Sequence, residues 1–145
     1  MILFNLWERQ NAMKALYSKC VGTICNRHEM TRMELDILLF LANNPQYDTA
    51  TEIVEVRYLS KSQVSFSIKL LEEKGYLRKE YASDNRKTAH LKICEEAYPI
   101  IADGREAQKK FIAIMLQGFT GEDIECMKRY TDHIMKNISE YLEEE

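Results

Sequence analysis

The chain has 145 residues, enough for one domain with a hydrophobic core of its own. Its composition, 46% hydrophobic and 30% charged, argues against a disordered protein, and no apolar run approaches the roughly 20 residues that cross a bilayer. The first ten residues lack the basic segment of a secretory signal, so we expect a cytoplasmic protein without a membrane partner.

The net charge of −3 hides an uneven distribution along the chain. Residues 57–92 contain nine basic and four acidic residues, whereas residues 120–145 contain eight acidic and three basic ones. Each charged run could be an ordinary solvated face. The alternative is that the basic middle of the chain forms a surface for a nucleic acid.

Four helix starts are marked in the sequence. In each, a Ser or Thr is followed three residues later by an acid or an amide, a spacing at which the two residues can cap each other's backbone N–H groups. The expected caps are Thr31 with Glu34, Thr49 with Glu52, Ser60 with Gln63, and Thr120 with Asp123. Before them, residues 3–25 form a predicted amphipathic helix whose apolar stripe includes Leu16 and Cys20.

The middle of the chain predicts two short helices joined by a tight turn. The second, residues 60–74, has a buried stripe of Val64, Ile68 and Leu71 and ends where Gly75 can adopt a left-handed conformation. Its opposite face is expected to point outward. That face consists of Lys61, Ser62, Gln63, Ser65, Phe66 and Lys69.

Two short strands should follow, because "YLRKEYA" and "TAHLKI" alternate apolar and polar residues. Leu77 and Tyr81 mark the apolar face of the first strand, and Leu91 marks that of the second. Residues 83–87, which include a charged Asp-Asn-Arg-Lys run, are the expected tip of this hairpin.

Two further helices are predicted at the C-terminal end, over residues 95–117 and from Thr120 onward. The last one repeats apolar residues at steps of three and four, a heptad-like seam that needs a partner. We expect it to pack, with the N-terminal helix, against a second copy of the chain; a helical cap within one chain is the alternative. The expected dimerisation residues are Leu16, Met127, Ile134, Ile138 and Tyr141.

The predicted fold is therefore mainly α with a small β-hairpin wing, a winged helix-turn-helix flanked by N- and C-terminal dimerisation helices. The expected parts are residues 1–30, 31–94 and 95–145. The segment "LLEEKGYL" (70–77) and the D-x-R of Asp84, Asn85 and Arg86 resemble the MarR family of transcriptional regulators.

The resemblance implies a homodimer that binds a pseudo-palindromic double-stranded DNA operator and acts as a repressor. Helix 60–74 would enter the major groove, and wing residues 82–88 would reach the minor groove. Arg86 would insert there, Lys87 would meet a phosphate, and Asp84 would order the wing by pairing with a basic residue.

Within the helix, Ser62, Gln63 and Ser65 could hydrogen-bond to base edges, and Lys61 and Lys69 suit phosphates. Phe66 stands where many relatives have arginine and either contacts a thymine methyl group or packs inward. Tyr58 replaces a glycine that is frequent at the turn.

The resemblance also implies a regulating signal. One form is a small phenolic or other anionic effector between the helical arms and the DNA-binding lobe. Another is oxidation of Cys20. The alternative is that Cys20 is buried and inert. We expect no cofactor, no metal and no enzyme activity, because the sequence has none of the common catalytic motifs and its Cys25-x-x-His28 step stands alone. A winged-helix module for protein contacts is the remaining alternative.

Overall fold

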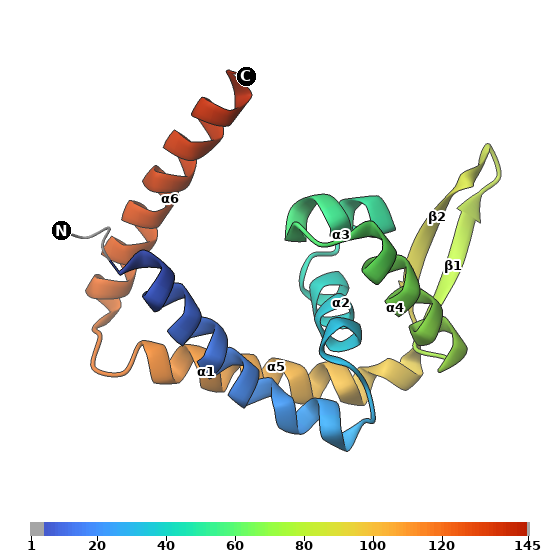
Figure 1. The fold of residues 1–145 in the computed structure, drawn as a ribbon, viewed down its shortest axis with the longest axis horizontal. Helices are drawn as coiled ribbons and strands as arrows, with labels where there is room; N and C mark the ends of the chain where they lie inside the picture. The colour runs from blue at the N-terminus through green and yellow to red at the C-terminus, as the bar shows by residue number, and fades with distance from the viewer. Residues whose placement is uncertain (1–4, 145) are drawn as a thin grey trace. The chain divides into compact units, whose positions relative to one another are not determined.

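The computed structural model describes residues 5–144, which form helices and one hairpin (Figure 1). The elements are α1 (Leu6–Arg27), α2 (Arg32–Asn43), α3 (Ala50–Arg57), α4 (Lys61–Glu73), β1 (Leu77–Ala82), β2 (Asn85–Ile93), the short 3-10 helix η1 (Glu95–Ala97), α5 (Tyr98–Met115) and α6 (Gly121–Glu143). The mainly α fold with a hairpin wing is confirmed. The chain divides into two compact units, one ending at Phe111 and the other beginning at Ile112. None of the described helices is long and apolar enough to cross a membrane.

The predicted caps begin four of the helices. Thr31, Thr49 and Thr120 each form the reciprocal box, in which hydroxyl and carboxylate both accept a backbone N–H. At Ser60 only half of the box forms, because its hydroxyl accepts the Gln63 N–H at 3.1 Å and no return bond is present in the described structure. The Gln63 side chain is therefore not used to start its helix.

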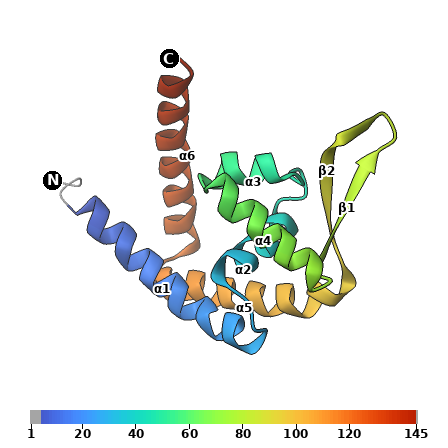
Figure 2. The ribbon, with the colours of Figure 1, turned by 45° about the vertical axis from the view of Figure 1, so that its right-hand side comes forward.

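The core of the first unit is built around α2, which packs against α1 and α4, while α3 packs against α4 (Figure 2). The central helix is buried along most of its length, including Leu35 and Leu38. The predicted stripe of α4, Val64, Ile68 and Leu71, is fully or almost fully buried. One face of α4 is thus fixed by apolar burial, which leaves its other face for solvent.

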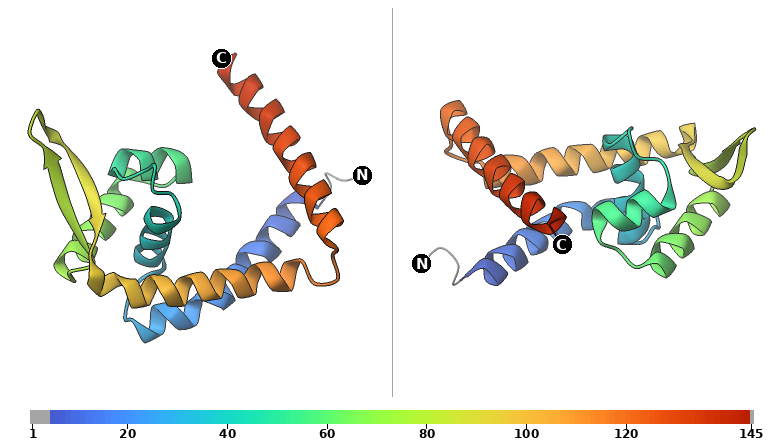
Figure 3. Two further views of the ribbon diagram at one scale, coloured as in Figure 1. Left: turned by 180° about the vertical axis from the view of Figure 1, so that it is seen from behind. Right: turned by 90° about the horizontal axis from the view of Figure 1, so that it is seen from above.

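The hairpin projects from the helices of this unit (Figure 3). Its strands are antiparallel, with Leu77 opposite Ile93, and the register shifts between Glu80 and Ala82. At this irregularity Tyr81 is exposed, so the expectation that it shares the buried face of Leu77 is wrong. The tip is also shorter than expected, because β2 already begins at Asn85 and places Arg86 and Lys87 on a strand.

Helix α1 is joined to α5 by side-chain contacts within the first unit. The Tyr17 and Phe111 rings meet edge to face at 5.1 Å between centroids, and Gln108 donates to the Tyr17 hydroxyl at 3.1 Å. Near the end of α1, Arg27 and His28 lie 3.0 and 2.9 Å from one carboxylate oxygen of Asp103. Hydrogen bonds, first from His28 and then from Arg27, lower the pKa of Asp103.

One buried charge connects the end of α4 to the start of α2. The Glu34 carboxylate is 1% exposed and accepts the Thr31 N–H at 3.1 Å and the Lys74 ammonium at 2.8 Å. Lys74 also donates to the carbonyl of Glu29, a residue with a left-handed φ of 51°, at 3.1 Å. The far end of α4 is therefore held by the loop between α1 and α2.

We predict that Lys74→Met destabilises the fold by about 2–4 kcal/mol, because it leaves the Glu34 carboxylate buried without its cation. Urea unfolding followed by circular dichroism measures the change. Lys69→Met, a lysine on the same helix without an ion pair among the described residues, should stay within about 0.5 kcal/mol of the wild type. Equal stability of the two variants would contradict the role given to this ion pair.

Candidate nucleic-acid interface

The outward face of α4 carries the six residues expected there. Lys61, Ser62, Gln63, Ser65, Phe66 and Lys69 are all exposed. The Phe66 ring is 62% exposed, which rules out the inward-packing alternative and leaves contact with a thymine methyl group as the prediction for this residue. The face therefore combines hydrogen-bonding groups, two cations and one aromatic ring.

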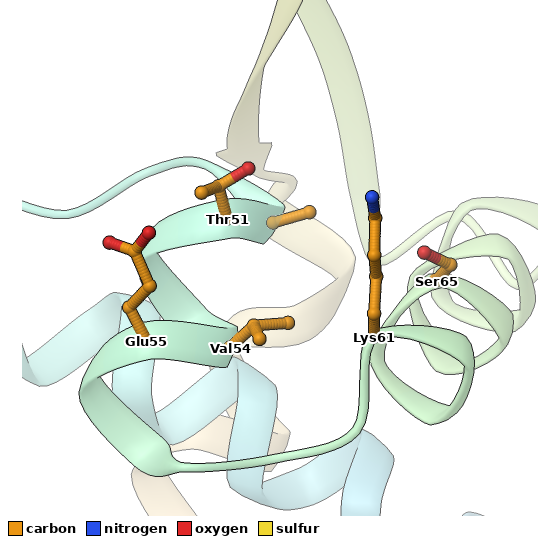
Figure 4. Close-up of a pocket in the computed structure, with 6 residues that line it drawn as sticks. Thr51, Val54, Glu55, Lys61 and Ser65 are labelled. Atoms are coloured by element: carbon orange, nitrogen blue, oxygen red, sulfur yellow. The ribbon is translucent and has the colours of Figure 1, made fainter.

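A small pocket of about 150 Å³ separates the first turns of α3 and α4 (Figure 4). Lys61 and, beside it, Ser65 come from α4 on one side, and Thr51 and Val54 come from α3 on the other (Figure 4). Glu55 of α3 also lines the pocket, and the volume is below that of a typical small-molecule site. The contribution of α3 to this surface was missed from sequence, where only its capping residues Thr49 and Glu52 were identified.

Asp48 ties the hairpin to the loop that precedes α3. Its backbone carbonyl accepts the Leu91 N–H at 2.7 Å, and its carboxylate lies 2.9 Å from His90 Nδ1 and 3.8 Å from Lys92 Nζ. Together these bonds place β2 beside the start of α3. Asp48 was not identified from sequence, since no local pattern links it to residues more than 40 positions away.

The tip of the wing is ordered by Asn85. Its side-chain oxygen accepts the backbone N–H groups of Lys87 at 3.0 Å and Thr88 at 3.3 Å, and its amide donates to the Thr88 hydroxyl at 3.0 Å. The ion pair expected for Asp84 is not formed among residues 5–144. A side-chain cap at the turn takes its place, because Asn bonds its own backbone readily at turns.

Arg86 lies at the edge of an open hollow on the wing. The hollow measures about 480 Å³ and is also lined by Tyr81, Ala82 and Ser83. Tyr81 lies at the point where the strand register shifts, between Glu80 and Ala82. The guanidinium is thus accompanied by an aromatic ring that sequence periodicity had assigned to the other face.

The basic residues of α4 and the hairpin fall into two groups. The first group is neutralised by carboxylates: Lys74 by Glu34, Arg78 by Glu80, Lys79 by Glu72, and Lys92 by Asp48. The second group forms no ion pair within the described part of the chain. It consists of Lys61, Lys69, Arg86 and Lys87, the four cations predicted to face DNA.

The cysteines and histidines do not converge on a metal site in the described residues, where no group of three His, Cys, Asp or Glu side chains could hold an ion. Burial raises the pKa of the Cys25 thiol, Arg32 opposes the shift and Asp36 adds to it, so Cys25 is protonated at neutral pH. Cys20 is partly buried against the core.

Comparison with known proteins points to one family. Residues 28–87 match the sequence model of the MarR family. A putative MarR family transcriptional regulator from Listeria monocytogenes, solved in complex with a 26mer DNA, has a TM-score of 0.80 with 20% identity over 93% of this chain and 89% of that chain.

Two further structures are similar over nearly the whole length. A MarR protein from Peptoclostridium difficile gives a TM-score of 0.78 with 15% identity, covering 97% of this chain and 92% of that chain. The transcriptional regulator SlyA gives 0.74 with 21% identity, covering 94% and 95%. At these identities the likeness establishes the fold.

We predict that Asn85→Ala loosens the wing tip, since it removes both backbone bonds that the side chain accepts. Amide hydrogen exchange of Lys87 and Thr88 should become faster, while global stability falls by about 1 kcal/mol or less. Asp84→Ala is the matched control, because Asp84 forms no ion pair among the described residues. Faster exchange in the Asp84 variant alone would show that the tip is ordered differently.

Proposed function

Because this chain belongs to the MarR family of winged-helix transcriptional regulators, we propose that it binds double-stranded DNA as a homodimer. Helix α4 enters the major groove and the hairpin reaches the adjacent minor groove. The target is a pseudo-palindrome whose half-sites lie about one helical turn apart.

The separation of paired from unpaired cations is the observation that carries this proposal. Lys61, Lys69, Arg86 and Lys87 are exposed and without an ion pair in the described structure, so they can meet phosphates without first losing a protein contact. DNA binding releases the counterions of the phosphates that such residues neutralise. The cations that form ion pairs instead hold α4 and the hairpin in place, and these elements carry the four unpaired cations.

Base reading is proposed for the polar residues of the α4 face. Gln63 can form two hydrogen bonds with adenine, and its amide is not engaged in capping its own helix. Ser62 and Ser65 supply short donors and acceptors. Phe66 offers an apolar surface to a thymine methyl group. Arg86 is suited to the narrow minor groove, where the negative potential is enhanced.

Pairing of two copies is proposed from the apolar side chains of α6. No described residue of this 23-residue helix is buried within the single chain, and Met127, Ile134, Ile138 and Tyr141 are all exposed. An apolar seam of this length left in water is unfavourable and indicates a partner surface. A twofold pair would present two α4 helices, which matches a pseudo-palindromic operator.

Repression by occupying the operator, with release by a small phenolic or other anionic effector, is the regulation that we propose from the family. Cys20 offers a redox alternative, and its partial burial against the core means that oxidation would disturb packing. Use of the winged helix for protein contacts is a second alternative. That alternative predicts weak DNA binding with little dependence on salt.

We predict that Arg86→Ala weakens operator binding by about 1–3 kcal/mol while leaving the oligomeric state unchanged. Fluorescence anisotropy with duplexes selected from genomic DNA measures the affinity across a salt series. The wild type should show a log–log slope of about −0.9 for each phosphate neutralised.

Lys110→Ala is the matched control for loss of one exposed positive charge, because Lys110 lies on α5 outside the proposed surface. Its affinity should equal that of the wild type. The wing assignment fails if Arg86→Ala also binds like the wild type, and a shallow wild-type slope would favour the protein-contact alternative.

We predict that Ile134→Asp produces monomers, because it places a carboxylate in the middle of the apolar seam of α6. Sedimentation velocity reports the change, and DNA affinity should fall with it since paired half-sites are lost. Asp132→Asn, two residues away and outside the heptad-like seam, should remain dimeric. A dimer that survives Ile134→Asp would place the interface elsewhere.

A further inference from the structure

Tyr58, at the turn between α3 and α4, combines an unfavourable backbone conformation with almost complete exposure. Its φ and ψ are 52° and 46°, the left-handed region that a bulky residue rarely occupies. Its side chain is 89% exposed, the largest value among the exposed large hydrophobic residues. Burial of the ring therefore does not compensate for the strain of the backbone.

The bonds around Tyr58 fix the turn and keep the ring outside. The N–H groups of Tyr58 and Leu59 both donate to the carbonyl of Val54, the latter at 3.2 Å. Leu59 packs against the core, and the next residue, Ser60, is the N-cap of α4. The backbone of Tyr58 is thus fixed three residues before Lys61, the first residue of the helix that carries the proposed base-reading side chains.

The chemistry beside Tyr58 favours an anion. Lys61, one of the cations without an ion pair in the described structure, follows three residues later, whereas Arg57 before it lies 4.0 Å from a carboxylate oxygen of Asp36. The Tyr58 hydroxyl forms no hydrogen bond with any described residue. A phenol is a neutral donor that can bond a phosphodiester oxygen without adding charge.

We propose that Tyr58 is a DNA backbone contact, whose hydroxyl donates a hydrogen bond to a phosphate oxygen at the edge of the major groove entered by α4. This inference rests on the proposed function. It assigns binding to a residue of the turn, outside both the recognition helix and the wing. Its strained conformation is then retained for the contact, in the way that strain collects at functional positions.

Two substitutions separate the contact from the strain. Tyr58→Phe removes only the hydroxyl, whereas Tyr58→Gly removes the ring and accepts the left-handed conformation without a Cβ clash. Tyr98→Phe, in an exposed tyrosine of α5, is the matched control. Affinities of the full-length dimer for selected and scrambled duplexes are measured across a salt series, with thermal unfolding of each variant.

Both Tyr58 variants should bind DNA about 3- to 10-fold more weakly than the wild type, which corresponds to the loss of one hydrogen bond. The factor should be the same for the selected and the scrambled duplex. The salt slope should stay unchanged, whereas Lys61→Ala should make it shallower by about 0.9. Tyr58→Gly should unfold at the same temperature as the wild type or higher, so its weaker binding cannot come from misfolding.

The proposal is overturned if Tyr58→Phe binds like the wild type and like Tyr98→Phe. A loss confined to the selected duplex would also overturn it, because that result would mean a base contact. If the wild type itself shows no salt-dependent DNA binding, the proposed function fails and the contact fails with it. Normal wild-type binding with an unaffected Tyr58→Phe rejects the Tyr58 contact alone.

Discussion

The buried carboxylate of Glu34 is the contact on which the DNA-binding lobe depends. It caps the start of α2 through the Thr31 N–H and holds the end of α4 through Lys74. Since removing one partner of a buried ion pair leaves an uncompensated charge, this connection strongly favours a single placement of α4 against α2. The buried stripe of α4 fixes the rotation of the helix about its axis. Its outward face is left exposed to solvent.

In the hairpin too, some charged residues hold the structure together and others are free to bind a ligand. Asp48 and Glu72 attach its strands to the helices, through Leu91 and His90 in one case and Lys79 in the other. The cations used in these attachments are not available to a ligand, whereas the other basic residues of α4 and the hairpin, Lys61, Lys69, Arg86 and Lys87, form no ion pair among the described residues. An acidic chain can therefore present a local positive surface, because the field near a surface depends on where charges lie and not on their sum.

The features that follow from local sequence were predictable, and those that depend on distant partners were not. Helix starts, the stripe of α4 and the left-handed Gly75 each depend on a few neighbouring residues, and each is present. The expected pair of Asp84 and the inward face of Tyr81 failed for a different reason. Asn85, and not Asp84, bonds the backbone of the wing tip, and the strand register shifts between Glu80 and Ala82; an alternation pattern shows neither.

We propose that two α4 helices, each held by its own chain, occupy successive major grooves of one duplex. Hydroxyl-radical footprinting of the protein on a duplex selected from genomic DNA can decide this. We expect two protected segments related by twofold symmetry, with centres about one helical turn apart and protection of the adjoining minor grooves by the wings. A single protected segment, or uniform protection without spacing, would contradict this account.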